Sequence, residues 1–417
     1  MNVTLLNTYD SSGGAAKASF RLHQSLRQAE INSSILVQSK TSDDPYVKEK
    51  PKSFWERRLS NLNTLMDQLP VKCYSSRLPQ TFSPAWWPTN INHQITEIQP
   101  DIVHLQWICD GFIRLESLSK IKQSIVWTLH DMWPFTGGCH YSGDCNGYIN
   151  GCGSCPQLDS NKENDLSSKV VKRKKKIFKG LNLYIVTPSR WLTSCAKASF
   201  LFKNLPVETI PYCLNLDRYS PVNPIYARKV LGLPENKKLI LFGAMSATSD
   251  PRKGFHLLRQ SIQYLTENNS VDAEIVILGS SKPTSPPDFR LKTHYMGVLH
   301  DDISISLLYG ACDVFVAPSL EDNLPLTVME SLSCGTPCVT FDIGGMPDMI
   351  DHKENGFLAK PFDTKEFAMG IEWVLEDEKR HKALSCEARR KIELNYSNEL
   401  ISNKYKSLYE DILKKQT

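Results

Sequence analysis

The chain has 417 residues, of which 41% are apolar and 23% are charged, and this composition excludes a disordered chain, a collagen and a small disulfide-stapled scaffold. Since one domain typically takes about 100–200 residues, two or three domains are expected. The net charge of +4 comes from one segment, because seven of the eleven residues 169–179 are basic and without them the sum is −3. A general nucleic-acid-binding surface is therefore not expected.

The sequence also bears on the compartment. No stretch approaches the roughly 18 apolar residues of a membrane-spanning helix, and the chain does not open on the basic and apolar segments of a secretory signal. We therefore expect a cytoplasmic protein whose thiols are reduced.

The first half alternates short apolar runs with helix-length segments. A strand at Val3–Leu6 is followed by a loop with Gly13 and Gly14, a helix over Ala16–Ala29 and a strand at Ile35–Val37, which together form one βαβ unit. Further strands are predicted at 102–105, 124–128 and 183–186. Their apolar, β-branched character indicates a parallel sheet covered on both faces.

A second alternation follows a proline-rich stretch at 206–224. It has predicted strands at 239–242, 274–278, 294–296, 314–316 and 338–341, predicted helices at 255–266, 303–311 and 326–333, and a charged helical tail over 377–415. We therefore expect an α/β fold with an N-terminal domain over 1–205, a linker over 206–224 and a C-terminal domain over 225–376. A helical tail over 377–417 is expected to pack back toward the N-terminal domain. Two open sheets joined in this way would face a cleft, with ligands at the carboxyl ends of their strands.

Two acidic residues mark a candidate sugar-binding segment in the second half. Asp322 lies in the loop after the strand at 314–316, and Glu330 lies eight positions later, in the predicted helix. A carboxylate can accept two hydrogen bonds from a vicinal diol such as that of a ribose or a hexose. Glu330 stands among apolar residues, where an unpaired charge would be costly, so we interpret it as functional.

This segment, followed by Cys334-Gly335-Thr336-Pro337, resembles the signature of the retaining GT-B glycosyltransferases of family four, and the resemblance covers essentially the whole chain. It implies two Rossmann-like domains, with Glu330 on the nucleotide ribose and Asp322 on the donor sugar. The family usually has Glu at the latter position, which is here preceded by Glu321. Leu324-Pro325 replaces the usual Phe-Gly, and we include Leu324 among the donor-binding residues.

Two further segments are similar to the family's donor-binding motifs. Arg252 and Lys253 precede a predicted helix and would clamp the diphosphate, Arg as a bidentate donor and Lys as a point charge. Gly13 and Gly14 open the first helix, where backbone amides and the helix dipole favour an anion. Gly344-Gly345 resembles a later landmark and is predicted to form a tight turn under the nucleotide.

Histidines follow two strands of the first half. His130, with Asp131 beside it, resembles the family's N-domain histidine near the reacting sugar, and Asp131 would orient it or face the acceptor. The pattern His104-Leu105-Gln106-Trp107 is similar to a subgroup motif that carries a second histidine at the position of Gln106. We therefore do not expect acid–base chemistry at position 106.

The resemblance implies transfer of a sugar from a nucleotide diphosphate sugar to a glycan or lipid-linked acceptor in bacterial surface polysaccharide synthesis. Arg252 and Lys253 would stabilise the leaving diphosphate in place of a metal, and no Asp-x-Asp metal motif is present. No cofactor is expected for catalysis. Two alternatives remain open: a non-catalytic sugar-nucleotide-binding protein and a GT-B-type sugar-nucleotide epimerase.

Two local features have their own interpretations. The basic segment 169–179 is either a solvated helix face or a patch that holds the protein against anionic lipid at the inner face of the membrane. The cysteines Cys139, Cys145, Cys152 and Cys155 lie in a glycine-rich loop with the spacing C-x5-C-x6-C-x2-C. This spacing favours a structural zinc site, with His140 as an alternative ligand, over two disulfides or four free thiols.

Overall fold

The computed structural model describes residues 1–50, 63–87, 91–243, 250–267, 271–284 and 286–415. The chain divides into two compact units, one formed by Met1–Pro211 with Ile401–Thr417 and the other by Tyr212–Leu400. We refer to them as the N-terminal and C-terminal units.

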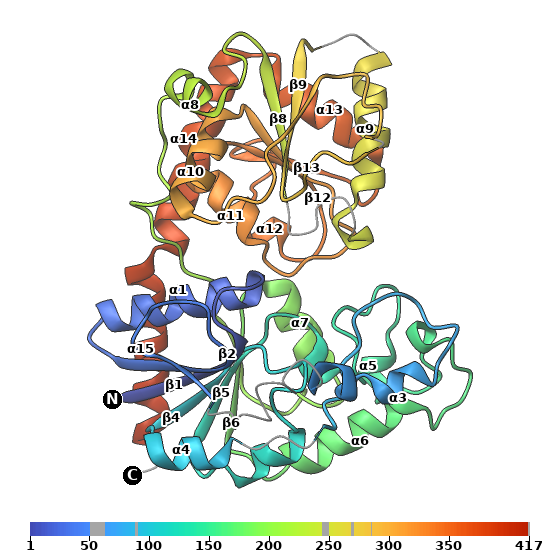
Figure 1. The fold of residues 1–417 in the computed structure, drawn as a ribbon, viewed down its shortest axis with the longest axis vertical. Coiled ribbons are helices and arrows are strands. Elements are labelled where there is room, and N and C mark those ends of the chain that lie inside the picture. Colours follow the sequence, from blue (N-terminus) through green and yellow to red (C-terminus); the bar gives the residue numbers. More distant parts are fainter. Residues whose placement is uncertain (51–62, 88–90, 244–249, 268–270, 285, 416–417) are drawn as a thin grey trace. The chain divides into compact units, whose positions relative to one another are not determined.

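The N-terminal unit is built around a parallel seven-stranded sheet with the order β3-β2-β1-β4-β5-β6-β7 (Figure 1). Its strands are β1 (Asn2–Tyr9), β2 (Asn32–Ser39), β3 (Val47–Glu49), β4 (Ile102–Leu105), β5 (Ser124–Thr128), β6 (Leu183–Thr187) and β7 (Val207–Thr209). Its helices and 3-10 turns are α1 (Gly14–Gln28), α3 (Leu69–Lys72), α4 (Asn92–Ile98), η1 (Leu115–Lys120), η2 (Trp133–Phe135), α5 (Gly147–Asn150), η3 (Pro156–Leu158), α6 (Leu166–Phe178), α7 (Arg190–Ala198) and α15 (Asn398–Lys414).

The central strands of this sheet are apolar without alternation because both faces are covered. All five residues of β5 are buried, and so are all four of β4. One apolar cluster contains Val103 and Leu105 of β4, Ile125 and Trp127 of β5, and Trp133. Parallel strands place their carboxyl ends on one edge, so the residues that follow β1, β4 and β5 meet there.

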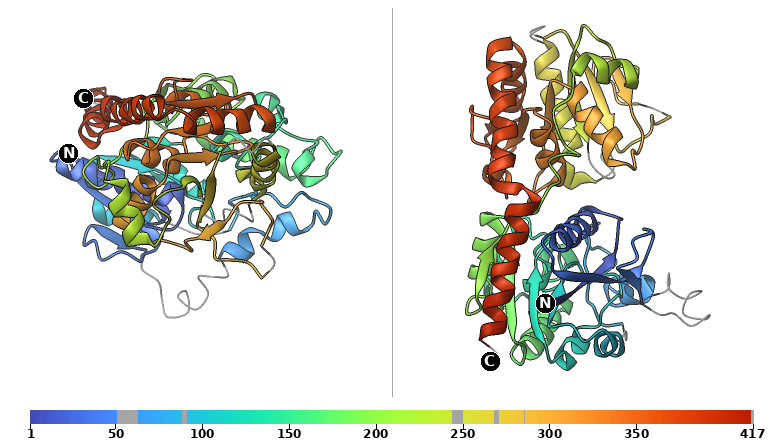
Figure 2. Two further views of the ribbon diagram at one scale, coloured as in Figure 1. Left: turned by 90° about the horizontal axis from the view of Figure 1, so that it is seen from above. Right: turned by 90° about the vertical axis from the view of Figure 1, so that its left-hand side faces the viewer.

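The C-terminal helix α15 packs in the N-terminal unit although it follows the C-terminal unit in sequence (Figure 2, dark red). Its Tyr409 hydroxyl lies 2.7 Å from Nδ1 of His104, and Nε2 of His104 lies 2.8 Å from Oγ1 of Thr128. The Thr128 hydroxyl lies 2.8 Å from that of Tyr405. These buried hydrogen bonds join α15 to β4 and β5.

The C-terminal unit has a parallel six-stranded sheet with the order β10-β9-β8-β11-β12-β13. Its strands are β8 (Lys238–Gly243), β9 (Ala273–Leu278), β10 (Thr293–Tyr295), β11 (Val314–Ala317), β12 (Cys338–Phe341) and β13 (Gly356–Ala359). Its helices and turns are α8 (Pro224–Leu231), η4 (Pro251–Lys253), α9 (Phe255–Glu267), α10 (Asp302–Ala311), α11 (Leu326–Ser333), α12 (Met346–Met349), α13 (Thr364–Leu375) and α14 (Glu378–Tyr396).

The predicted fold class is confirmed, since both units are doubly wound parallel sheets of the Rossmann type. β4, β5, α11 and β12 have the predicted bounds. The prediction missed three edge strands, β3, β7 and β13. β7 lies inside the stretch interpreted as a linker, and β3 and β7 have only three residues each and lack an apolar run. Across the part of the chain that is described, no helix is both long enough and apolar enough to cross a membrane.

Candidate functional site

In the C-terminal unit, the segment 250–254 packs against the loop that follows β11. Asp250 caps the short turn η4 by accepting from the backbone N–H of Arg252 at 3.0 Å. Gly254 has φ of +71°, and a Cβ at this position would overlap the carbonyl oxygen of Pro318. Only glycine therefore allows this close approach, which brings the turn against the loop after β11.

This packing brings three of the predicted site residues together. Nζ of Lys253 donates to Oδ2 of Asp322 at 2.6 Å, and the Arg252 guanidinium lies 3.8 Å from the same oxygen. Arg252 also donates to the carbonyl of Glu321 at 3.1 Å and to Asp250 at 3.2 Å. The two cations thus face the loop that carries Asp322, at the carboxyl ends of the strands.

Asp322 is only 6% exposed, yet it is held as a carboxylate. Burial alone would raise its pKa, but the Lys253 and Arg252 cations outweigh burial and lower the pKa of this carboxyl below its usual value. The backbone beneath it is fixed by the Gly344-Gly345 turn. The N–H of Gly345 donates to the carbonyl of Asp322 at 3.2 Å, and a Cβ on Gly344 would overlap that carbonyl.

Glu330 lies on α11 and is 4% exposed. The hydroxyl of Tyr309, on α10, donates to its Oε2 at 3.1 Å. Burial and the nearby Glu330 raise the pKa of Tyr309 well above its usual value, so the hydroxyl keeps its proton. Sequence analysis did not identify Tyr309, because an aromatic residue on an apolar helix is expected to lie in the hydrophobic core. Leu324 is packed in the apolar core of this unit.

In the N-terminal unit, Gly13 is the N-cap of α1 with φ of +96°, and a Cβ on Gly13 or Gly14 would have no neighbour within 4 Å. The loop therefore borders open space at the start of a 15-residue helix. Nε2 of His130, after β5, lies 2.8 Å from Oε1 of Gln106, after β4. Burial lowers the pKa of His130 to about 4, although the neighbouring Asp131 acts in the opposite direction.

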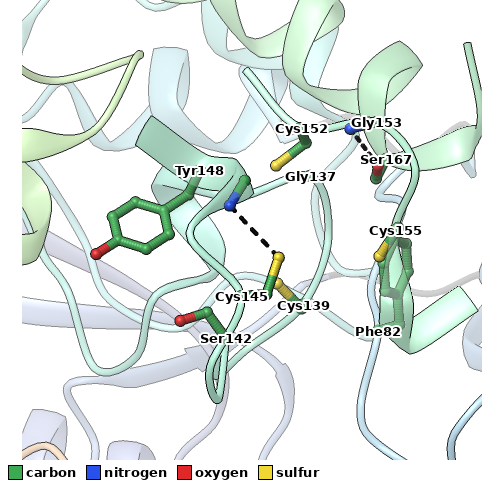
Figure 3. Close-up of a pocket in the computed structure, with 11 residues that line it drawn as sticks. Phe82, Gly137, Cys139, Ser142, Cys145, Tyr148, Cys152, Gly153, Cys155 and Ser167 are labelled. Carbon is green, nitrogen blue, oxygen red and sulfur yellow. Dashed lines mark hydrogen bonds between the residues drawn. The ribbon is translucent and has the colours of Figure 1, made fainter. Parts of the chain in front are cut away.

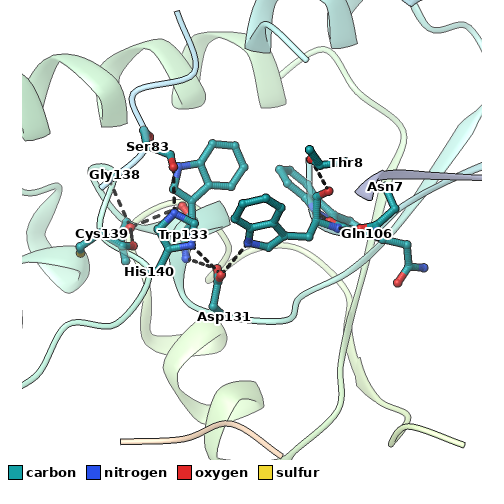
Figure 4. A network of polar contacts seen from close by, with 12 residues as sticks. Asn7, Thr8, Ser83, Gln106, Asp131, Trp133, Gly138, Cys139 and His140 are labelled. Carbon is teal, nitrogen blue, oxygen red and sulfur yellow. Dashed lines mark hydrogen bonds and ion pairs between the residues drawn. The ribbon is translucent and has the colours of Figure 1, made fainter. Parts of the chain in front are cut away.

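Asp131 is the centre of a separate buried network (Figure 4). Its carboxylate accepts from His140 Nδ1 at 2.7 Å, from the indole of Trp107 at 3.0 Å and from the backbone N–H of Trp133 at 2.9 Å. These donors, with His140 the strongest, outweigh burial and lower its pKa. Nε2 of His140 lies 2.9 Å from the Ser83 hydroxyl. Sequence analysis offered His140 only as a metal ligand, and Ser83 carries no sequence signal.

The four loop cysteines line one small pocket with Phe82, Gly137 and Ser167 (Figure 3). All four are free thiols. The predicted zinc site is not supported, because among the described residues no group of three or more His, Cys, Asp or Glu side chains is arranged to hold a metal ion. Burial raises the pKa of Cys139, Cys152 and Cys155, which favours the thiol over the thiolate form. The fourth cysteine, Cys145, accepts a hydrogen bond from the backbone N–H of Gly147 through its Sγ.

The basic segment forms most of α6, and its seven cations do not share one role. Arg173 donates to Glu116 and to the carbonyls of Pro84 and Ala85. Lys174 is buried, with Nζ donating to Thr136 at 3.0 Å and to Trp133, and burial lowers its pKa to about 7. The other five are exposed: Lys169, Lys172, Lys175, Lys176 and Lys179.

The C-terminal unit is similar in sequence to known proteins. Residues 226–391 match the family model of the glycosyl transferases group 1. The chain is 23% identical over 220 residues to N-acetyl-alpha-D-glucosaminyl L-malate synthase of Bacillus anthracis, covering 51% of this chain and 55% of the relative. It is 28% identical over 218 residues to UDP-Gal:alpha-D-GlcNAc-diphosphoundecaprenol alpha-1,3-galactosyltransferase of Escherichia coli, covering 50% and 55%. These matches span about half the length of each relative.

Among solved structures, sucrose-phosphate synthase from Thermosynechococcus elongatus superimposes with a TM-score of 0.70 over 99% of both chains, at 16% identity. At this identity the likeness shows the fold alone. Residues 226–391 of the C-terminal unit therefore resemble the glycosyl transferases group 1, and the fold of the chain is that of the GT-B glycosyltransferases.

Proposed function

We propose that this protein is a retaining hexosyltransferase that moves a sugar from a nucleotide diphosphate sugar to a hydroxyl of a glycan or lipid-linked acceptor. The observation that carries the proposal is the cluster of Arg252, Lys253 and Asp322 at the carboxyl edge of the sheet in the family segment. Two cations beside one carboxylate suit a substrate with an anionic diphosphate and a hydroxyl-bearing sugar.

In this proposal each residue has a defined role. Arg252 and Lys253 stabilise the charge that develops on the leaving diphosphate, so no catalytic metal is needed. Asp322 accepts from the donor sugar, and Glu330, steadied by Tyr309, accepts from the ribose. Gly13 and Gly14 present backbone amides to the phosphates. His130 lies near the reacting sugar, and Asp131 holds the loop that carries His130 through its buried hydrogen bonds. No residue serves as a covalent nucleophile.

A screen of nucleotide sugars, with and without acceptors, tests this function. Release of nucleotide together with a glycosylated product supports transfer. Tight binding without turnover would identify a sugar-nucleotide-binding protein, and an isomerised donor would identify an epimerase.

We further propose that the protein works at the cytoplasmic face of a membrane, held by the exposed face of α6. Lys169, Lys172, Lys176 and Lys179 follow one another at intervals of three, four and three residues, so they share one face of the helix. The relative from Escherichia coli has a printed name that specifies a diphosphoundecaprenol-linked acceptor. A lipid-linked acceptor would be reached from such a position.

Co-sedimentation with vesicles tests the membrane contact. Binding to anionic vesicles at low salt, lost at high salt and lost when the four lysines are changed to alanine, is the expected result. The matched control changes four other exposed lysines of the same unit, Lys48, Lys72, Lys120 and Lys122. Equal binding by the two quadruple variants, or no binding by the parent, would leave α6 as a solvated surface.

A further inference from the structure

Four partly exposed aromatic side chains lie at the carboxyl edge of the sheet in the N-terminal unit. Each belongs to a different strand end: Tyr9 ends β1, Trp107 follows β4, Tyr141 lies in the loop after β5, and Trp191 lies in the first turn of α7, after β6. These strands are neighbours in the order β1-β4-β5-β6. Since the carboxyl ends of parallel strands share one edge, the four rings border the same edge of the sheet.

The four rings form two stacked pairs. The ring centroids of Tyr9 and Trp107 lie 6.3 Å apart, with an angle of 26° between their planes. Those of Tyr141 and Trp191 lie 6.4 Å apart, with an angle of 15°. His140, the chain neighbour of Tyr141, has its ring centroid 5.6 Å from that of Trp107. The two pairs therefore lie next to each other along the edge of the sheet.

Protein carboxylates hold the first pair in place. The Tyr9 hydroxyl donates to Oδ2 of Asp110 at 3.0 Å, and the indole N–H of Trp107 donates to Asp131 at 3.0 Å. Burial and Asp110 raise the pKa of Tyr9 to about 12, so the hydroxyl keeps its proton. The carbonyl of Trp107 accepts from the N–H of Thr8 at 2.8 Å. Both rings are therefore oriented before any ligand binds, which lowers the entropy cost of binding.

Core packing uses only part of these rings. Trp107 and Trp191 pack against the apolar cluster of the unit, yet both keep part of their surface in water. A pyranose ring fits such a surface, because its C–H groups form an apolar face that stacks on an aromatic ring while its hydroxyls stay at the rim. Asp110, partly exposed beside the first pair, can accept hydrogen bonds from such hydroxyls.

A lipid chain fits these observations less well than a sugar. It would cover the Asp110 carboxylate with hydrocarbon, and the removal of a charged group from water without new hydrogen bonds is costly. A sugar on the same rings supplies hydrogen bonds from its hydroxyls. The arrangement of stacked rings with a carboxylate beside them therefore favours a glycan.

We propose that the two aromatic pairs are adjacent subsites for an oligosaccharide acceptor, each binding one pyranose ring. The proposal rests on the proposed function and narrows its acceptor to a glycan with at least two sugar rings. The sugar on the pair of Tyr9 and Trp107 is neutral or cationic, because Asp110 repels the carboxylate of a uronic acid.

Fluorine NMR of the protein labelled with fluorotryptophan tests the subsites without donor or turnover. Trp107→Phe and Trp191→Phe assign the two signals, and the probes are lactose, cellobiose, maltose and N,N′-diacetylchitobiose. At least one disaccharide should shift both signals and bind at least tenfold more tightly than its monosaccharides. The control is Trp373, a partly exposed tryptophan of the C-terminal unit, whose signal should not move. No shift with any disaccharide, or shifts with farnesol alone, would overturn the proposal.

Kinetics with the donor found by the screen separate the subsites from the proposed function. Trp107→Leu and Trp191→Leu should each raise KM for an oligosaccharide acceptor at least tenfold, with a smaller change in KM for the donor, and Trp373→Leu should keep both parental values. Transfer with the parental acceptor KM in both variants would reject the subsites and leave the function standing. Disaccharide binding without transfer from any donor would support the subsites and reject the function. NMR of the parent decides even where a leucine variant does not fold.

Discussion

Nζ of Lys253 lies 2.6 Å from Oδ2 of Asp322, so the cation assigned to the diphosphate is already paired with the carboxylate assigned to the donor sugar. Both side chains are largely buried, which makes the pair resistant to screening by salt. A bound diphosphate would compete with Asp322 for Lys253, and the carboxylate released in this exchange could turn to the sugar hydroxyls.

The first prediction follows from this exchange. Asp322→Asn removes the competing charge, so pyrophosphate should bind two- to tenfold more tightly while sugar transfer falls, because the donor sugar loses its acceptor group. Titration calorimetry with pyrophosphate measures the first effect. Glu321→Gln, at the adjacent acidic residue, is the control and should bind pyrophosphate as the parent does. Weaker binding by Asp322→Asn would contradict the exchange.

The second prediction concerns the two cations and metal dependence. Arg252→Ala and Lys253→Ala should each lower kcat by at least tenfold, because each removes charge stabilisation of the leaving group. The far-ultraviolet circular dichroism of both variants should match the parent. A chelator should leave parental turnover unchanged. Loss of activity in chelator with recovery on added magnesium would show that the cations do not replace a metal.

The third prediction concerns Glu330. Glu330→Gln keeps the size of the side chain but weakens acceptance from the ribose, so nucleotide binding should weaken by about 1–3 kcal/mol. Tyr309→Phe removes the 3.1 Å hydrogen bond to Glu330 and should cost about 0.5–1.5 kcal/mol of the same binding energy. Glu354→Gln, at an exposed position, is the control. Parental affinity in Glu330→Gln would exclude Glu330 from the ribose site.

The fourth prediction concerns acid stability. The pKa of His104 is lowered to about 3 by burial, so this ring stays neutral in the folded state while it takes up a proton near pH 6.5 when unfolded. Its contribution to stability is therefore complete above pH 6.5 and is lost as the pH falls toward 3, by about 1.4 kcal/mol per pH unit.

Denaturant unfolding between pH 7 and pH 5 measures this loss. A variant His104→Gln should show a shallower decline in the free energy of unfolding over that range than the parent. Tyr409→Phe, which leaves Nδ1 of His104 without its 2.7 Å partner, should cost about 1–3 kcal/mol at pH 7. If His104→Gln and the parent had the same pH dependence, groups other than His104 would account for the loss of stability in acid.

The sequence was most informative where a strand is buried on both faces. The apolar runs at β4, β5 and β12 define these strands without help from tertiary contacts. The three residues of β7 are at most partly buried, so only pairing with β6 makes them a strand. Short edge strands are specified by their neighbours rather than by their own composition.

In the candidate site, too, some residues could be predicted from the sequence and others could not. Arg252, Lys253, Asp322 and Glu330 could be proposed from their resemblance to the family's motifs, and the structure brings the first three together. Their partners could not be foreseen. Tyr309 is 21 positions from Glu330, and Ser83 is 57 positions from His140. Such contacts depend on how the chain folds in space. Neither Tyr309 nor Ser83 stands in a sequence pattern that distinguishes it from an ordinary buried residue.

The cysteine loop shows the limit of reasoning from spacing. Its pattern indicated four metal ligands, but the ring of His140 is engaged by Asp131 and Ser83, and the four thiols line a pocket without a metal-binding arrangement. Spacing fixes how far apart ligands can lie, whereas the direction of each side chain depends on backbone turns. Here Cys152, Gly153 and Ser154 all have positive φ.

The most direct test of the central claim is proton NMR of the product formed from the best nucleotide sugar and an acceptor alcohol. The account predicts a glycoside whose anomeric configuration equals that of the donor, formed in the presence of chelator and not formed by the double variant Arg252→Ala with Lys253→Ala. An inverted product, or a parent that transfers no sugar from any donor in the screen, would contradict it.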